Sequence, residues 1–142
     1  MKKIIYTLLI ALLAFAFMGC PTVYKENYDL TVNVGDIVGD FNGDGEAATN
    51  NGDGTYTAKF AYKDSMAAWG NGDGKCAFKM RTVAGDWGAP AYGLDDPLIL
   101  GADYVECSTT GGNITVEGLV EGKTYTVTFL VVGDKVSVKI GE

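Results

Sequence analysis

The 142-residue chain lacks histidine and contains only three cysteines and eleven basic residues, against eighteen acidic ones. Without histidine, His-ligated zinc sites, Ser-His-Asp triads and Cys-His dyads are excluded, and three cysteines are too few for a four-cysteine zinc site. The formal net charge of −7 argues against nucleic acid as a partner, because phosphate contacts need clustered Lys and Arg. It also argues against an anionic membrane surface. We therefore expect a binding or structural protein and no enzyme.

The N-terminus has the pattern of a bacterial export signal. Lys2 and Lys3 precede an apolar run over residues 4–18, which is shorter than the roughly 20 residues that span a bilayer. The run ends at Gly19-Cys20, which resembles a lipobox, so we expect residues 1–19 to be a cleaved signal peptide. Cys20 would then carry acyl chains that anchor the protein in the cell envelope, with the outer membrane as the expected location. The alternatives are an ordinary secretory signal cut elsewhere and a retained N-terminal anchor.

Residues 20–27 would be the lipidated cysteine and a short tether, followed by one domain over residues 28–142. In an exported protein, the two remaining cysteines, Cys76 and Cys107, form an even pair in a compartment that permits disulfides. We expect them to be bridged; the alternative is two separate buried thiols.

Apolar and polar residues alternate with a period of two, which is the period of β-strands. Long strands are predicted at residues 28–34, 55–62, 75–81, 124–131 and 135–140, and shorter ones at 37–38, 104–108 and 113–116. The only helix candidate is a turn near residues 64–68. Seven or eight short strands, glycine-rich turns and no covering helices predict an all-β fold, a single antiparallel immunoglobulin-like β-sandwich.

The register of the C-terminal hairpin follows from its turn. Gly133-Asp134 suits a two-residue primed turn, which pairs Val132 with Lys135. This register sets three apolar pairs on one face of the hairpin: Val131 with Val136, Phe129 with Val138, and Val127 with Ile140. Turn chemistry and hydrophobic pattern therefore predict the same pairing.

The tetrad Asn-Gly-Asp-Gly occurs three times, at residues 42–45, 51–54 and 71–74. The simpler interpretation is turn formation, because Asn, Asp and Gly tolerate positive φ. The alternative is calcium binding by Asp40, Asn42 and Asp44, since the oxygen ligands alternate and Gly45 occupies the sixth position of an EF-hand-type loop. The twelfth position, where such loops carry a bidentate Glu, is Asn51. No other cofactor is expected.

Several short motifs occur in an order that points to a known family. They are Gly-Asp-Phe-Asn at 39–42, Asp-Gly-Thr-Tyr at 53–56, Phe-Lys-Met-Arg at 78–81, Gly-Asp-Trp at 85–87, Tyr-Gly at 92–93 and Gly-Lys-Thr-Tyr-Thr-Val-Thr-Phe at 122–129. Over residues 28–140 this order resembles early-set carbohydrate-binding modules of the glycogen-binding type. It is also similar to the repeat domains of outer-membrane starch-binding lipoproteins. The resemblance implies a β-sandwich that binds glucan without cleaving it.

The two tryptophans are the main candidates for ligand contact, because flat, rigid indole rings pack well against the C–H faces of sugars. Trp69 precedes Gly70-Asn71-Gly72, and Trp87 lies between Asp86 and Gly88. Both segments are rich in turn-forming residues, although a loop tryptophan can also close the end of a sandwich. Tyr92, Lys79, Arg81 and Asp86 complete the predicted site.

Two functions follow as expectations. The first is a surface lipoprotein whose β-sandwich binds carbohydrate, with α-glucan as the candidate class. The second is a surface lipoprotein that binds a protein partner or assembles with itself through an exposed strand edge, with a calcium-stabilised loop as an optional feature. An exposed tryptophan platform would favour carbohydrate, whereas buried tryptophans beside a long open edge would favour a protein partner.

Overall fold

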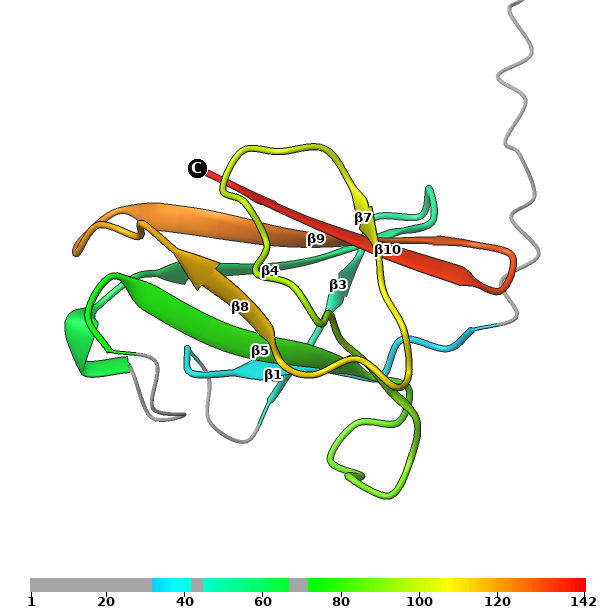
Figure 1. The fold of residues 1–142 in the computed structure, drawn as a ribbon. Coiled ribbons are helices and arrows are strands. Elements are labelled where there is room, and N and C mark those ends of the chain that lie inside the picture. Colours follow the sequence, from blue (N-terminus) through cyan, green and yellow to red (C-terminus); the bar gives the residue numbers. More distant parts are fainter. Residues whose placement is uncertain (1–31, 42–44, 67–71) are drawn as a thin grey trace, which may run out of the picture.

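The computed structural model describes residues 32–41, 45–66 and 72–142, which form two antiparallel β-sheets packed face to face. The predicted signal peptide, the tether and Cys20 lie outside these residues. Figure 1 shows the sheets as two layers, with β4, β9 and β10 in one and β1, β5 and β8 in the other. The predicted all-β sandwich is therefore confirmed.

The first layer, sheet A, is built around the central strand β5 (Lys75–Arg81). Its order is β2-β1-β5-β6, and β8 pairs with β5 beyond the end of β6. The bounds of the other strands are β1 (Asp36–Gly39), β2 (Glu46–Ala47), β6 (Ala91–Tyr92) and β8 (Ile114–Glu117). A 3-10 turn, η1 (Asp64–Met66), falls where the sequence predicts its helix candidate.

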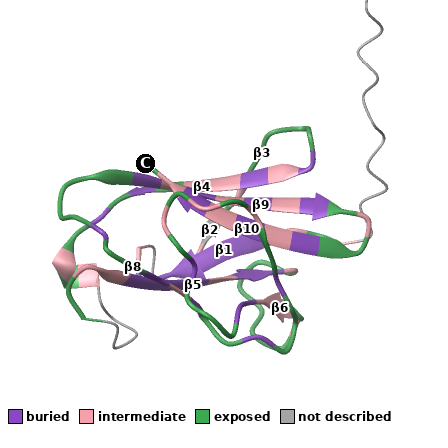
Figure 2. Ribbon diagram, turned by 45° about the horizontal axis from the view of Figure 1, so that its top comes forward, coloured by how far each residue is buried: buried purple, intermediate pink, exposed green. Residues whose placement is uncertain are grey.

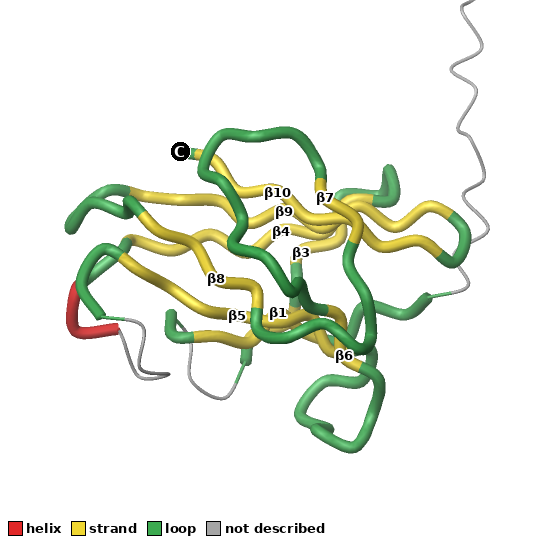
Figure 3. Tube along the Cα trace, in the orientation of Figure 1, coloured by secondary structure: helices red, strands yellow, loops and turns green. Residues whose placement is uncertain are grey.

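The second layer, sheet B, has the order β3-β4-β9-β10-β7. Its strands are β3 (Thr49–Asn50), β4 (Thr55–Ala61), β7 (Val105–Glu106), β9 (Thr124–Val132) and β10 (Lys135–Gly141). The long loop between β6 and β7, green in Figure 3, crosses from one layer of the sandwich to the other. No helix among the residues described here is long and apolar enough to cross a bilayer.

The hydrophobic core fills the space between the sheets, because every second residue of each long strand points inward. Phe78 of β5 meets Phe129 of β9 edge to face across the two layers, with ring centroids 6.3 Å apart. Phe41 stacks on Phe60 at 4.4 Å. Figure 2 shows the buried residues running in bands along the strands of both layers.

The predicted register of the C-terminal hairpin is confirmed. Val132 pairs with Lys135, and the pairs Val131–Val136, Phe129–Val138 and Val127–Ile140 follow in sequence. All six of these apolar side chains are buried. Gly133 has φ of +61°, as a primed turn requires at its first position.

The strand predicted at residues 28–34 is not found in its described part: residues 28–31 lie outside the described residues, and residues 32–34 are not in a strand. The short strand predicted at residues 37–38 is present as β1. The chain joins sheet A through Gly35, whose N–H donates to the Arg81 carbonyl at 2.9 Å. Val32 and Val34 still pack against the core. The alternation of apolar and polar residues here therefore indicates which side chains face inward, although the backbone does not pair in a strand.

The predicted disulfide is wrong. Cys76 lies in β5 of sheet A, Cys107 follows β7 of sheet B, and both are free thiols buried in the core. The alternative of two separate buried thiols is the one found. Removal from water raises the pKa of each thiol to about 12. Neither cysteine is therefore a nucleophile at neutral pH, because the thiolate is the reactive form.

Candidate functional site

Trp87 lies in the loop over residues 82–90, which connects β5 to β6 at one end of sheet A. The loop is closed at its base, where the N–H of Thr82 donates to the Pro90 carbonyl at 3.0 Å and the Thr82 hydroxyl donates to the same oxygen at 2.9 Å. Inside the loop, the Gly88 N–H donates to Asp86 Oδ1 at 2.7 Å. These bonds give the segment around Trp87 a defined shape, and the tryptophan is 59% exposed.

The loop is built over a buried ion pair between Arg81 and Asp36. The two residues pair directly across β5 and β1, and both point away from the core because their neighbours Met80 and Ile37 point into it. Arg81 Nε donates to Asp36 Oδ1 at 2.7 Å, and Arg81 Nη2 donates to Asp36 Oδ2. The side chains are only 2% and 4% exposed, so the outer face of sheet A is covered at this point.

The guanidinium of Arg81 also supports the indole ring of Trp87. The guanidinium carbon lies 4.5 Å from the ring centroid, within the range of a cation–π contact. The exposed tryptophan is thus supported by a residue that is itself 1% exposed and held by two bonds to a carboxylate.

Two glycines allow the backbone to approach the ion pair closely. The N–H of Gly85 donates to Asp36 Oδ2 at 3.0 Å, which attaches the loop to β1. A Cβ on Gly45 would lie 2.8 Å from Asp36 Oδ2 and 2.9 Å from Arg81 Nη2. Both glycines have positive φ, at +76° and +94°, a conformation that side chains disfavour. The ion pair is therefore enclosed by segments that converge from two loops.

This arrangement suits the stacking of a flat apolar surface on the indole. Val83, in the same loop, is 51% exposed, so the loop presents a second apolar side chain. The pyranose ring of a sugar offers C–H groups to such a surface, and its hydroxyls need polar partners at the edge. Asp86 lies next to Trp87 in the chain and provides a carboxylate there.

The other predicted ligand residues are distributed unevenly. Lys79 faces outward two residues before Arg81, and its Nζ donates to the Gly111 carbonyl at 3.0 Å. Tyr92 pairs with Met80 and packs partly against the core, so it belongs to the opposite face of sheet A from Arg81. Arg81 is buried beneath the platform and has a supporting position. Trp69 lies outside the described residues.

The candidate calcium loop is described only at its ends. Asn42 and Asp44 lie outside the described residues, whereas Asp40 is buried and its Oδ2 accepts the Ala77 N–H at 2.7 Å. Asp40 therefore ties the end of β1 to β5. Within the described ranges, no group of three or more His, Cys, Asp or Glu side chains could hold a metal ion.

The second Asn-Gly-Asp-Gly tetrad forms a turn, as the simpler interpretation predicts. Asp53 Oδ1 accepts the Thr55 N–H at 3.0 Å, and Gly52 and Gly54 have φ of +80° and +84°. In the third tetrad, Gly72 and Gly74 also have positive φ. Bonds to Thr55 lower the pKa of Asp53, because they stabilise its carboxylate form.

Sequence reasoning missed Asp36, the residue that holds Arg81 in place. Asp86 and Arg81 were both predicted as polar partners of a ligand, whereas Arg81 is bound to Asp36, 45 positions away in β1. Only the register between β1 and β5 brings the two together, and no local pattern encodes that register. A polar residue within an otherwise buried strand, in the sequence Asp36-Ile37-Val38, is the one available signal.

Comparison of the chain with protein-family models, with curated proteins and with solved structures finds no match.

Proposed function

We propose that this protein is an exported lipoprotein, anchored through Cys20 to the cell envelope, whose β-sandwich binds carbohydrate without cleaving it. The single observation that carries the proposal is Trp87, which is 59% exposed and stacked over the buried guanidinium of Arg81. Tryptophan is enriched at binding interfaces, because its ring combines a large, flat apolar surface with an N–H donor. A rigid support lowers the entropy lost when a ligand stacks on it.

The nature of the platform favours a neutral sugar, and α-glucan is the candidate class. The positive charge of Arg81 is paired with Asp36 and shielded from solvent, so the ligand meets an aromatic face and not a free cation. Asp86, the nearest carboxylate in the chain, suits hydroxyl donors and opposes an acidic ligand at this site.

Tryptophan fluorescence of the purified protein, titrated with maltoheptaose, tests this proposal. We expect a saturable change in emission that is lost in Trp87→Ala and kept in Ile99→Ala, which truncates another exposed apolar residue, 71% exposed. A flat titration with maltoheptaose would remove α-glucan as the ligand. An unchanged titration in Trp87→Ala would remove this loop as the site.

A protein partner that adds a strand to sheet B is the second candidate. Of the described residues, β3 pairs with β4 only at Tyr56 and Thr57, which leaves residues 58–61 paired on one side with β9. This open edge is short and carries Lys59, and a lysine on an edge strand is a common obstacle to edge-to-edge pairing. We therefore rank carbohydrate above a protein partner.

A further inference from the structure

The outward side of strands β4, β9 and β10 differs in charge from the rest of this acidic protein. Strands β4, β9 and β10 contain three lysines and no Asp or Glu, although the chain holds eighteen acidic residues. Their outward positions are occupied mainly by hydroxyl and ammonium groups: Thr55, Thr57, Lys59, Thr124, Thr126, Thr128, Lys135, Ser137 and Lys139. We call this set the hydroxyl–lysine face.

The strand register arranges these groups in rows across the sheet. Thr57 of β4 pairs with Thr128 of β9, which pairs with Lys139 of β10. In the adjacent row, Lys59 pairs with Thr126. Neighbouring strands lie about 4.8 Å apart, so the hydroxyls of Thr126 and Thr128 lie between the two lysines.

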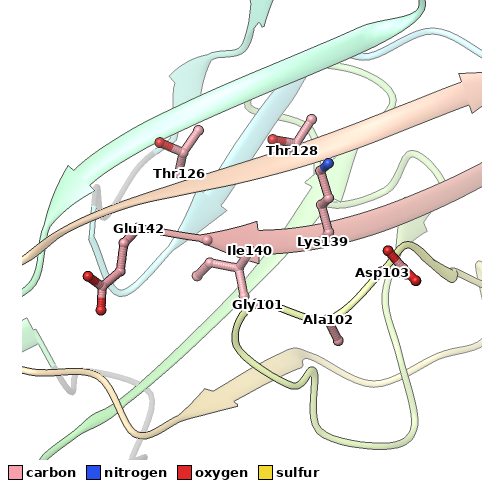
Figure 4. A pocket seen from close by; sticks show the side chains of 9 residues that line it. Gly101, Ala102, Asp103, Thr126, Thr128, Lys139, Ile140 and Glu142 are labelled. Carbon is pink, nitrogen blue, oxygen red and sulfur yellow. The ribbon is translucent and has the colours of Figure 1, made fainter.

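A pocket of about 370 Å³ opens on this face, between β9, β10 and the segment at residues 101–103. Its charged side chains are Lys139, Asp103 and Glu142, and the Glu142 carboxylate is paired with Lys123. Figure 4 shows Thr126 and Thr128 projecting from β9 beside Lys139 of β10, with Asp103 on the facing loop. The ammonium of Lys139 lies 4.5 Å from the ring centroid of Tyr104, which holds the side chain against the sheet. The volume falls within the usual range for small-ligand pockets.

Lys139 and Lys59 differ from the other lysines of this region in their partners. Lys135 forms an ion pair with Glu106 at 3.1 Å, and Lys123 forms one with Glu142 at 2.6 Å. Within the part of the chain that the structure describes, no carboxylate lies within ion-pair distance of Lys139 or Lys59. Two ammonium groups on one face therefore remain available to an anionic ligand.

We propose that the hydroxyl–lysine face binds an acidic polysaccharide, a chain of uronic acid residues, at a site separate from Trp87. Carboxylates of the glycan pair with Lys139 and Lys59, and its hydroxyls bond to Thr126, Thr128 and the Asp103 carboxylate at the pocket rim. A lipid surface fits less well, because the only large apolar side chain exposed on these three strands is Val132, 46% exposed at the end of β9. A neutral glycan would leave both lysines unused.

The test is calorimetric titration of the purified protein with pentagalacturonate, with maltopentaose as the neutral comparison. We expect binding of pentagalacturonate that weakens with added salt and by roughly five-fold in Lys139→Gln and in Lys59→Gln. Thr128→Val, which removes a hydroxyl at nearly constant shape, should weaken binding further in the Lys139→Gln background. Lys63→Gln makes the same charge change at an exposed lysine outside the face and should leave affinity unchanged.

Three results would overturn this proposal. The first is no binding of pentagalacturonate, and the second is an equal loss in Lys63→Gln, which would indicate non-specific charge attraction. The third is binding of the protein to phosphatidylserine vesicles that is abolished in Lys139→Gln and is not reduced when pentagalacturonate is added. Because the site is independent of the loop at residues 82–90, Trp87→Ala should bind pentagalacturonate normally, so this proposal and the platform proposal can fail separately.

Discussion

The guanidinium of Arg81 lies 4.5 Å from the centre of the Trp87 ring, so an exposed indole packs on a charged group that is buried. The charge is balanced by Asp36, which also accepts the Gly85 N–H from the loop that carries the tryptophan. One carboxylate therefore fixes both the support and the loop. The position of Trp87 therefore depends on Asp36, which is only 3% exposed.

The first prediction concerns this ion pair. Asp36→Ala should lower the free energy of unfolding by about 3–5 kcal/mol, because it leaves the Arg81 charge buried without its partner. Urea unfolding followed by circular dichroism measures the change. Glu117→Ala is the matched control: it breaks the exposed Lys75–Glu117 pair, whose side chains are 44% and 59% exposed, and should cost at most about 1 kcal/mol. Similar small losses in both variants would contradict the structural role of Asp36.

The second prediction concerns the close approach of two backbone segments near the end of sheet A. Gly93 exchanges two backbone hydrogen bonds with Ser108, and a Cβ on Gly93 would lie 1.8 Å from the Gly112 carbonyl oxygen. Gly93→Ala should therefore cost about 1–3 kcal/mol or more in stability, since backbone must shift. Gly141→Ala, in open space at the end of β10, should change stability by less than about 0.5 kcal/mol. Equal thermal midpoints for the two variants would count against this packing.

The third prediction is a loss of stability at alkaline pH. Burial raises the pKa of both Cys76 and Cys107 from 9.0 to about 12, so between these values the unfolded chain releases thiol protons that the folded chain retains. The folded state binds more protons in this window, and stability therefore falls as pH rises from 9 towards 12. Urea titrations at pH 8, 9, 10 and 11 should show the decline, and Cys76→Ala with Cys107→Ala should reduce its slope. An unchanged slope in the double variant would assign the decline to other groups.

The fourth prediction separates a structural Asp40 from a calcium ligand. Asp40→Asn keeps an oxygen that can accept the Ala77 N–H, whereas Asp40→Ala leaves that buried donor unpaired and should cost about 1–3 kcal/mol. If Asp40 is a structural residue and not a calcium ligand, Asp40→Asn should melt near the wild type, and EDTA should not change either midpoint. The opposite result would be a thermal midpoint that EDTA lowers in the wild type and leaves unchanged in Asp40→Asn. That result would establish the calcium loop.

The sequence predicts the long strands well because each has an inward face that must be apolar. β9 and β10 are the clearest case, since the Gly133-Asp134 turn and the three apolar pairs require the same register. The two-residue strands β2, β3 and β6 escape prediction because they are too short to show an alternation. Their pairing is decided by neighbouring strands and not by their own residues.

The site was predictable only in part, for a related reason. The turn-rich segment around Trp87 places the tryptophan in a loop, but the sequence leaves open whether the ring is a ligand platform or closes the end of the sandwich. The contact between Arg81 and Asp36 depends on how β1 aligns with β5, and Tyr92 falls on the other face because it pairs with Met80. Neither alignment is encoded in a local pattern.

Calorimetric titration of maltoheptaose into the wild type, Trp87→Phe and Trp87→Ala is the sharpest test of whether Trp87 is a stacking platform. We predict saturable binding in the wild type, weaker binding in Trp87→Phe because a smaller ring remains, and no measurable binding in Trp87→Ala. Circular dichroism should show that all three proteins keep the same β-sheet spectrum. Equal affinity in the wild type and Trp87→Ala, with both proteins folded, would contradict the claim.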